Sequence, residues 1–273
     1  MTLAQGDEAG FAALTAKIAR ERGFGTANYK DSCLRRRIAA RMRAMGAPDY
    51  HTYSRVLDDE PAEYERLLDA LTINVTKLFR DPPAWHAVER TVLGPLWALP
   101  HRVLRCWVAG CASGEEAYTL AALWHRFAAA RGEAARAGRV HILASDIDRA
   151  SLEAAERGAY ATAALAEAPA DVRARYFSSE APHEASRELK AMVRFERRDL
   201  LQDAAPAGAF QLITCRNVII YFDRASQETL MRRFHRALAP GGFLVLGKVE
   251  TLLGPARALF DACDQRQRIF RRP

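Results

Sequence analysis

The sequence has few cysteines, and it lacks the patterns by which cysteines define a fold or a metal site. The five cysteines are odd in number and widely spaced, and no two of them form a C-x-x-C pair. This pattern argues against a disulfide framework and against a zinc site. The seven histidines are equally scattered, so we expect no bound metal.

Long apolar runs are also absent. No window approaches the roughly 18 apolar residues of a membrane-spanning helix, and the first residues lack the basic start and apolar stretch of a secretory signal. With 49% hydrophobic residues, the chain can still build a substantial core. These properties predict a globular, cytoplasmic protein without membrane insertion.

Acidic residues are in the minority. The chain has 40 lysines and arginines against 33 aspartates and glutamates, which gives a net charge of +7. An excess of positive charge favours a partner of negative charge. Nucleic acid, an anionic membrane surface and an acidic protein surface all satisfy this condition.

Two parts of different character follow one another along the chain. Residues 11–80 have apolar residues at helical spacing, such as Leu34, Ile38 and Met42, without strand-like alternation. From residue 102, short apolar runs alternate with longer helical patterns, which is typical of a parallel sheet with helices on both faces. We expect a helical domain over residues 1–80, a linker over 81–100, and an α/β domain over 101–273 with an insertion at about 161–192.

A glycine-containing loop, GCASGEEAY at residues 110–118, follows the first apolar run and opens a helical pattern. It lacks the G-x-G-x-x-G pattern of dinucleotide-binding loops and has no phosphate-binding lysine. Its two glutamates would repel a phosphate at a helix N-terminus, so a ligand with a cationic end is favoured. The alternative for these acids is an S-x-x-E capping box, in which Glu116 reaches back to the cap amide.

Asp146 ends the second apolar run, where doubly wound folds receive ribose hydroxyls. The alternative is a helix N-cap for the helical pattern that follows. A glycine loop without phosphate chemistry, a glutamate at the start of the first helix and a ribose-binding acid together describe a ligand with an adenosine and a cationic amino-acid end. S-adenosylmethionine fits that description.

Six segments carry more specific motifs. The most specific are N-V-T-x-x-F-R-D-P at residues 74–82 and C-R-N-V-x-I-Y-F-D at 215–223. The others are G-E-E-A-Y, A-S-D-I-D, R-D-L-L and L-A-P-G-G, at residues 114–118, 144–148, 198–201 and 238–242. In this order the segments resemble the chemotaxis receptor methyltransferase family, CheR. The resemblance implies a class I S-adenosylmethionine-dependent methyltransferase fold, Rossmann-like with a mostly parallel sheet, with a small all-α N-terminal domain and a small inserted subdomain.

The resemblance also implies a reaction. In this family, methyl passes from S-adenosylmethionine to glutamate side chains of a chemoreceptor's helical bundle, forming glutamyl methyl esters in chemotaxis adaptation, with S-adenosylhomocysteine as product. The residues implied to be catalytic are Arg80 and Tyr221. The residues implied to bind the cofactor are Asn74, Thr76, Arg80, Gly110, Glu116, Asp146, Asp199, Leu200, Arg216 and Asn217.

Taken alone, several of these residues have simpler interpretations. Arg80 could belong to a helix that ends before a proline. Asn74 and Thr76 could be solvent-facing loop residues, and Tyr221 could pack in the core. The occurrence of all the motifs in one order favours the functional roles.

The resemblance bears on partners as well. Arg36, Arg37, Arg41 and Arg43 are spaced to form a basic helix face, which the resemblance implies docks on the receptor bundle; a solvated face is the alternative. The insertion lacks the glycine-rich loop with which some members bind the receptor's C-terminal tail, so we expect no tail binding. The enzyme is then expected in the cytoplasm, associated with membrane-bound receptor clusters.

Some positions depart from the family pattern. Asp199 stands where some members carry asparagine. The family's frequent G-H-S-E is G-K-V-E at residues 247–250, and we assign no role to Lys248.

Two other functions are compatible with the sequence. The same cofactor could serve methylation of RNA, although no basic stripe interleaved with aromatic residues is present. The chain could also be a catalytically silent S-adenosylmethionine-sensing module, and the presence of Arg80 and Tyr221 argues against that. We therefore expect a protein-glutamate O-methyltransferase that does not bind nucleic acid.

Overall fold

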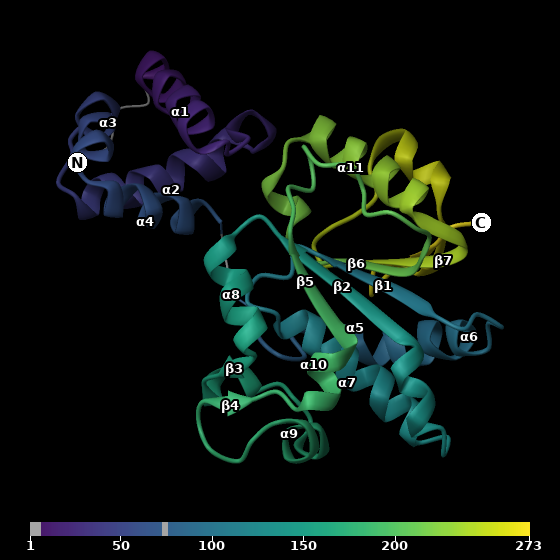
Figure 1. Ribbon diagram of the computed structural model, residues 1–273. Helices are drawn as coiled ribbons and strands as arrows, with labels where there is room; N and C mark the ends of the chain where they lie inside the picture. Colours follow the sequence, from purple (N-terminus) through teal and green to yellow (C-terminus); the bar gives the residue numbers. More distant parts are fainter. Residues whose placement is uncertain (1–6, 73–75) are drawn as a thin grey trace. The chain divides into compact units, whose positions relative to one another are not determined.

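The computed structural model describes residues 7–72 and 76–273 (Figure 1). The chain forms two compact units. One comprises the N-terminal helices together with the segment Tyr221–Ser226, and the other comprises the remaining residues from 76 onward. Asn74, one of the predicted cofactor residues, lies outside the described residues.

Amphipathic helices build the N-terminal unit. They are α1 (Glu8–Arg22), η1 (Thr26–Asn28), α2 (Asp31–Ala44), α3 (Tyr50–Asp59) and α4 (Pro61–Leu71). Asp7 and Asp49 cap α1 and α3, because each side chain accepts a hydrogen bond from a first-turn backbone N–H. Leu34, Ile38 and Met42 of α2 are buried, as their helical spacing predicts.

The expected basic face of α2 contains only part of the expected arginines. Arg36 and Arg43 are exposed. The prediction is wrong for Arg37, which is 8% exposed, and for Arg41, whose Nε donates at 2.9 Å to the buried carboxylate of Glu63. These two arginines point into the helical unit, because they donate hydrogen bonds to buried acceptors on α4.

Arg37 donates hydrogen bonds to backbone carbonyls at the C-terminal end of α4. Its Nη1 donates to the carbonyls of Ala70 and Leu71 at 3.1 and 2.6 Å, which are among the carbonyls left without helical partners at a C-terminus. Its guanidinium carbon lies 4.9 Å from the ring centroid of Tyr221. Tyr221 therefore belongs to the helical unit, where its carbonyl also accepts a hydrogen bond from the Lys30 N–H at 2.9 Å.

A seven-stranded sheet forms the second unit. Its order is β5-β2-β1-β6-β7-β9-β8. The first five strands in this order are parallel, and β9 pairs antiparallel with β7 and β8. The strands are β1 (Leu104–Ala109), β2 (Val140–Asp146), β5 (Val193–Arg197), β6 (Phe210–Cys215), β7 (Leu238–Leu246), β8 (Asp261–Asp264) and β9 (Ile269–Arg271). All six residues of β6 are buried, as expected for a strand covered on both faces.

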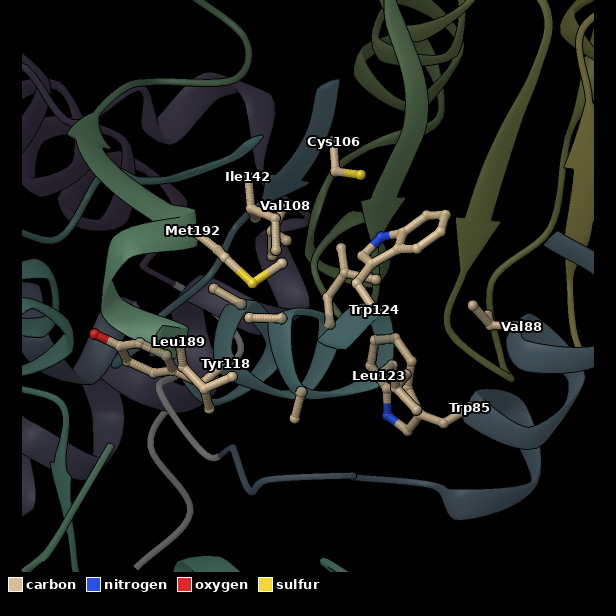
Figure 2. Packing of buried hydrophobic residues seen from close by; sticks show 14 of the residues in the cluster. Trp85, Val88, Cys106, Val108, Tyr118, Leu123, Trp124, Ile142, Leu189 and Met192 are labelled. Atoms are coloured by element: carbon tan, nitrogen blue, oxygen red, sulfur yellow. The ribbon is translucent and has the colours of Figure 1, made fainter. Parts of the chain in front are cut away.

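Helices cover both faces of this sheet. On one face lie α5 (Pro82–Val88), α7 (Glu115–Ala129) and α10 (Arg187–Met192), and on the other lies α11 (Arg224–Ala237) (Figure 1). Figure 2 shows Cys106, Val108 and Ile142 of the strands directed toward Tyr118 and Trp124 of α7. The intervening residue of β1, Trp107, points to the opposite face and meets Phe234 of α11 at a centroid distance of 5.3 Å.

The expected linker over residues 81–100 is wrong. These residues form α5, the π-helix η2 (Glu89–Leu93) and α6 (Gly94–Trp97). Trp85, Val88 and Leu96 belong to the same buried cluster as the sheet. The segment is an integral layer of the second unit, because its apolar side chains cover the sheet beside α7.

The expected insertion contains its own small elements. They are η4 (Thr162–Leu165), α9 (Ala170–Tyr176), β4 (His183–Glu184) and α10, and β4 pairs antiparallel with β3 (Ala159–Tyr160). The remaining elements are η3 (Ala134–Arg139), α8 (Arg149–Arg157), η5 (Ile219–Tyr221) and η6 (Gly254–Leu259). None of the helices within 7–72 and 76–273 combines the length and the apolar character that crossing a bilayer requires.

Candidate functional site

The loop after β1 adopts a backbone that depends on glycine. Gly110 and Gly114 have φ values of 82° and 92°, a region that side chains with a Cβ rarely enter. A Cβ on Gly110 would lie 2.4 Å from Cγ2 of Val218, so the close approach also excludes a larger residue. The N–H groups of Gly110 and Cys111 donate to the carbonyl of Ser145 at 2.8 and 3.0 Å, which ties the loop to the end of β2.

Asp146 supports this loop from the end of β2. Its two carboxylate oxygens accept the N–H groups of Ala112 and Asp148 at 2.8 and 3.0 Å. Burial raises the pKa of Asp146, and these backbone hydrogen bonds oppose the rise. The alternative N-cap role is wrong, because α8 is capped by Asp148, which accepts the Ala150 N–H at 2.9 Å.

Glu116 points to the end of β6 and does not cap its own helix. Its Oε1 accepts from Thr214 Oγ1 at 2.6 Å, and its Oε2 accepts from Arg216 Nη1 at 3.2 Å. The capping-box alternative is therefore wrong. The N-cap of α7 is Gly114, without a side-chain cap, and the Ser113 hydroxyl donates to Glu115 at 2.8 Å.

Arg216 joins Glu116 to the segment that carries Arg80. Its Nη2 donates to the carbonyl of Arg80 at 2.9 Å and lies 3.8 Å from the carboxylate of Asp81. Its guanidinium carbon lies 4.7 Å from the ring centroid of Trp85, and the side chain is only 2% exposed. A buried guanidinium held by two carboxylates, a carbonyl and an aromatic face is fixed in direction. The structure thus brings the predicted residues Arg80, Glu116 and Arg216 together.

The backbone around Arg80 is held in an unusual conformation. Phe79 and Asp81 have positive φ values of 56° and 64°, which cost energy for residues other than glycine. The Phe79 N–H donates to Thr119 Oγ1 at 2.8 Å, and the Arg80 carbonyl accepts from Trp85 Nε1 at 3.0 Å. The alternative that Arg80 lies at a helix end is wrong, because Arg80 is not helical and α5 begins after it, at Pro82.

Asn217 is held by a residue that sequence reasoning missed. The Asn217 N–H donates at 3.0 Å to the carboxylate of Glu250, a residue that is 2% exposed. This carboxylate also accepts three other backbone N–H groups. Burial raises the pKa of Glu250, and the four N–H donors oppose the rise. The only signal in the sequence was the glutamate at the end of the 247–250 motif.

The predicted residues Asp199, Leu200, Thr76 and Tyr221 lie outside this hydrogen-bonded cluster of Glu116, Arg216 and the Arg80 segment. Asp199 and Leu200 follow β5, and the neighbouring Arg198 N–H donates to the Asp146 carbonyl at 2.8 Å. Asp199 accepts the Leu201 N–H at 2.8 Å. Thr76 is half-buried, and Tyr221 is part of the helical unit described above.

These residues fit S-adenosylmethionine. Each oxygen of Asp146 keeps a lone pair for a ribose hydroxyl, and Glu116 offers a carboxylate to an ammonium group. The Nε of Arg216 is buried and has no hydrogen-bond acceptor within the described part of the chain, which leaves a donor for the cofactor's carboxylate. A predominantly parallel sheet with a glycine loop and carboxylates at the carboxyl ends of its strands defines a class I S-adenosylmethionine-dependent methyltransferase.

Comparison with known proteins extends this assignment. Residues 74–269 match the S-adenosylmethionine-binding domain of CheR methyltransferases, and residues 9–72 match the all-α domain of the same enzymes. The chain belongs to the CheR methyltransferase family, and S-adenosylmethionine is its cofactor.

Individual proteins are similar to this chain to different extents. A chemotaxis protein methyltransferase of Listeria monocytogenes is 31% identical over 89% of this chain and 90% of its own length. An uncharacterized 104.1 kDa protein of Rhodobacter capsulatus is 36% identical over 89% of this chain, and the chain spans only 25% of that protein. The crystal structure of an S-adenosylmethionine-dependent methyltransferase from Mesorhizobium loti is 22% identical, with a TM-score of 0.30 over 56% of this chain and 51% of its own.

Proposed function

We propose that this protein transfers methyl from S-adenosylmethionine to glutamate side chains of chemoreceptors, forming glutamyl methyl esters in chemotaxis adaptation. Membership of the CheR family supports the reaction, and the name of the Listeria relative supports the chemotaxis role. The observation that carries the proposal is the buried Arg216, which connects Glu116 to the Arg80 segment. One residue thereby couples the proposed cofactor contact to the proposed acceptor contact.

The proposed cofactor residues contact different parts of S-adenosylmethionine. Glu116 holds the amino group of the methionine end, and Asp146 accepts the ribose hydroxyls. Asp199 and Leu200 border the adenine, while Gly110 allows the close approach of the backbone. The assignments of Asn74, Thr76, Arg216 and Asn217 to the same site follow from the family motifs.

The proposed reaction depends more on positioning the acceptor carboxylate than on proton transfer. S-adenosylmethionine, when bound, supplies a methyl group on a positively charged sulfur. A glutamate carboxylate is already ionised near pH 7, so the acceptor needs no strong general base. We assign Arg80 to hold a carboxylate through its fork of donors and Tyr221 to add a hydrogen bond on the acceptor side. Orientation of oxygen, methyl and sulfur then supplies most of the acceleration.

The proposed receptor contact involves fewer arginines than the sequence predicts. Arg36 and Arg43, the exposed arginines of α2 among the four, remain the proposed contacts to an acidic surface of the receptor's helical bundle. Such docking would place the enzyme at membrane-bound receptor clusters in the cytoplasm.

The insertion supports a tail-independent enzyme. Strands β3 and β4 have two residues each, too few for a long peptide to add a strand. The adjoining loop closes on itself, because the Ser178 hydroxyl donates to the Glu180 carbonyl at 3.1 Å and accepts the Glu184 N–H at 2.8 Å. We expect calorimetry to detect no binding of a receptor tail peptide, and micromolar binding would contradict this part of the proposal.

The direct test is transfer of labelled methyl from S-adenosylmethionine to receptor-containing membranes, scored as methanol released by mild alkali. Wild-type protein should give alkali-labile label, and Arg80→Ala should abolish it. Label on RNA that resists mild alkali would favour an RNA methyltransferase instead. Tight cofactor binding without any transfer would favour a sensing module.

A further inference from the structure

The turn after β6 is built around one buried carboxylate. Glu250 Oε1 accepts the N–H groups of Val218 and Ile219 at 2.9 and 3.0 Å, and Oε2 accepts those of Asn217 and Gly247 at 3.0 and 2.6 Å. Three consecutive backbone donors of one turn thus converge on a single side chain. A carboxylate is the side chain suited to this arrangement, because it accepts several hydrogen bonds without presenting a donor.

The surroundings leave little freedom for this contact. Asn217 has a φ of 61°, a conformation that needs support in a residue other than glycine. A Cβ on Gly247 would lie 2.7 Å from Oε2 of Glu250 and 2.8 Å from the Asn217 nitrogen. The first and last residues of the 247–250 motif therefore make the contact together. Val249 of the same motif is 72% exposed.

The contact lies directly beside proposed cofactor residues. Strands β6 and β7 pair in parallel with Cys215 opposite Leu246, so the turns that follow them start side by side. Arg216 and Asn217 are the first two residues of the β6 turn, and Arg216 holds Glu116 and the Arg80 carbonyl. A shift of the turn would move these groups together.

We propose that Glu250 is a positioning residue for cofactor binding: it fixes the backbone of residues 217–219 and thereby sets the directions of Arg216 and Asn217. The inference rests on the cofactor roles assigned to Arg216 and Asn217 under the proposed function. It also explains why the 247–250 motif can carry lysine and valine at its centre, since the contact uses only its ends.

Replacing one carboxylate oxygen with an amide group should disrupt the turn. In Glu250→Gln the amide nitrogen would face two backbone donors, which repel it. We expect the dissociation constant for S-adenosylhomocysteine, measured by calorimetry on the full chain, to rise tenfold or more. Gly247→Ala should act in the same direction, because its methyl group displaces the carboxylate.

Two controls separate positioning from general destabilisation. Val249→Ala changes an exposed side chain of the same motif and should leave the dissociation constant unchanged. Val92→Ala removes buried atoms from η2, so it should lower the melting temperature without weakening S-adenosylhomocysteine binding. Amide proton shifts of residues 217–219 should move in Glu250→Gln and stay in place in both controls.

The outcomes are distinct. Wild-type affinity in Glu250→Gln, or in Gly247→Ala if the glutamine variant does not fold, would overturn the inference. Equal losses of affinity in Glu250→Gln and Val92→Ala would overturn it as well. Because the binding measurement needs no methyl acceptor, a wild-type chain that binds S-adenosylhomocysteine but does not methylate receptors would contradict the proposed function alone.

Discussion

Arg216 connects residues that are far from it in the sequence. Its hydrogen-bond partners Glu116 and Arg80 are 100 and 136 positions away. The guanidinium meets both through different nitrogens, and Asp81 and Trp85 border the same group. A lysine has a single ammonium group and cannot reproduce this fork.

Arg216→Lys should therefore weaken cofactor binding even though the charge is kept. We expect the dissociation constant for S-adenosylhomocysteine to rise by about tenfold, which is equivalent to about 1.4 kcal/mol. Isothermal calorimetry measures it, with Arg194→Lys at an exposed position of β5 as the matched control. Wild-type affinity in Arg216→Lys would contradict the central place of this residue.

Single residues differ in how far the sequence predicts them. Gly110, Glu116 and Asp146 follow predicted strands or open a predicted helix, so local pattern and motif are enough to select them as candidates. Three of the four backbone N–H groups that donate to Glu250 lie 31 to 33 positions away in the sequence, and only that of Gly247 is local. A local pattern carries no information about such a partner.

Helix α2 shows the same limit at the scale of an element. Its spacing correctly predicts the apolar stripe, but spacing alone cannot tell which of the four arginines of the predicted basic face are exposed. Arg41 turns toward Glu63, which is fully buried and also accepts the Tyr53 hydroxyl at 2.8 Å. A buried carboxylate needs such partners, because an unpaired charge in the interior is costly.

Arg41→Ala should destabilise the helical unit, whereas Arg43→Ala should not. Loss of Arg41 removes the cation that is hydrogen-bonded to the buried Glu63 carboxylate and leaves only the more distant Arg66, at 4.0 Å, at a cost of about 3 kcal/mol. Arg43 is exposed on the same helix, so its removal should change stability by less than about 0.5 kcal/mol. Urea unfolding followed by helical circular dichroism distinguishes the two, and equal midpoints would contradict the interpretation of the arginines.

The Glu63 cluster should also make stability depend on pH. Burial alone would raise the pKa of Glu63, but the hydrogen bonds from Arg41 and Tyr53 outweigh it and hold the pKa below the ordinary value of 4.5. A carboxylate with a lowered folded-state pKa stabilises above its unfolded pKa, and this contribution is lost as the pH falls through the folded value. The stability difference between wild type and Glu63→Gln should therefore shrink from about pH 4.5 downward. A difference independent of pH would contradict this.

Alternating patterns make the sheet the most predictable set of elements. The apolar runs at residues 103–109, 140–145 and 210–215 coincide closely with β1, β2 and β6, and the run at 243–246 covers only the last four residues of β7. The edge strand β8 has no such signal because its residues are mostly exposed. The linker prediction for residues 81–100 was wrong for another reason. Prolines at 82, 83 and 95 interrupt an apolar helical pattern, so the segment resembles a linker although its side chains cover the sheet.

On the scale of the whole molecule, charge and composition restrict the partner but do not identify it. A net charge of +7 is compatible with nucleic acid or with an acidic protein. The family assignment comes from matches over residues 9–72 and 74–269, and it favours a receptor as the partner. The exposed pair Arg36 and Arg43 offers a way to separate docking from catalysis.

Reversing this pair should weaken receptor methylation without affecting the cofactor. We expect Arg36→Glu combined with Arg43→Glu to lower kcat/KM for receptor-containing membranes by about tenfold at low salt. The difference from wild type should narrow as ionic strength rises, because salt screens exposed charges. Calorimetry with S-adenosylhomocysteine serves as the control and should show unchanged affinity. An unchanged methylation rate would contradict docking through α2.

The most direct test of the whole account is mass spectrometry of a receptor's cytoplasmic helices after incubation with the protein and S-adenosylmethionine. The account predicts a mass gain of one methyl group on glutamate side chains, removed by mild alkali and absent with Arg80→Ala. Methyl groups on other residue types, or none despite cofactor binding, would contradict it.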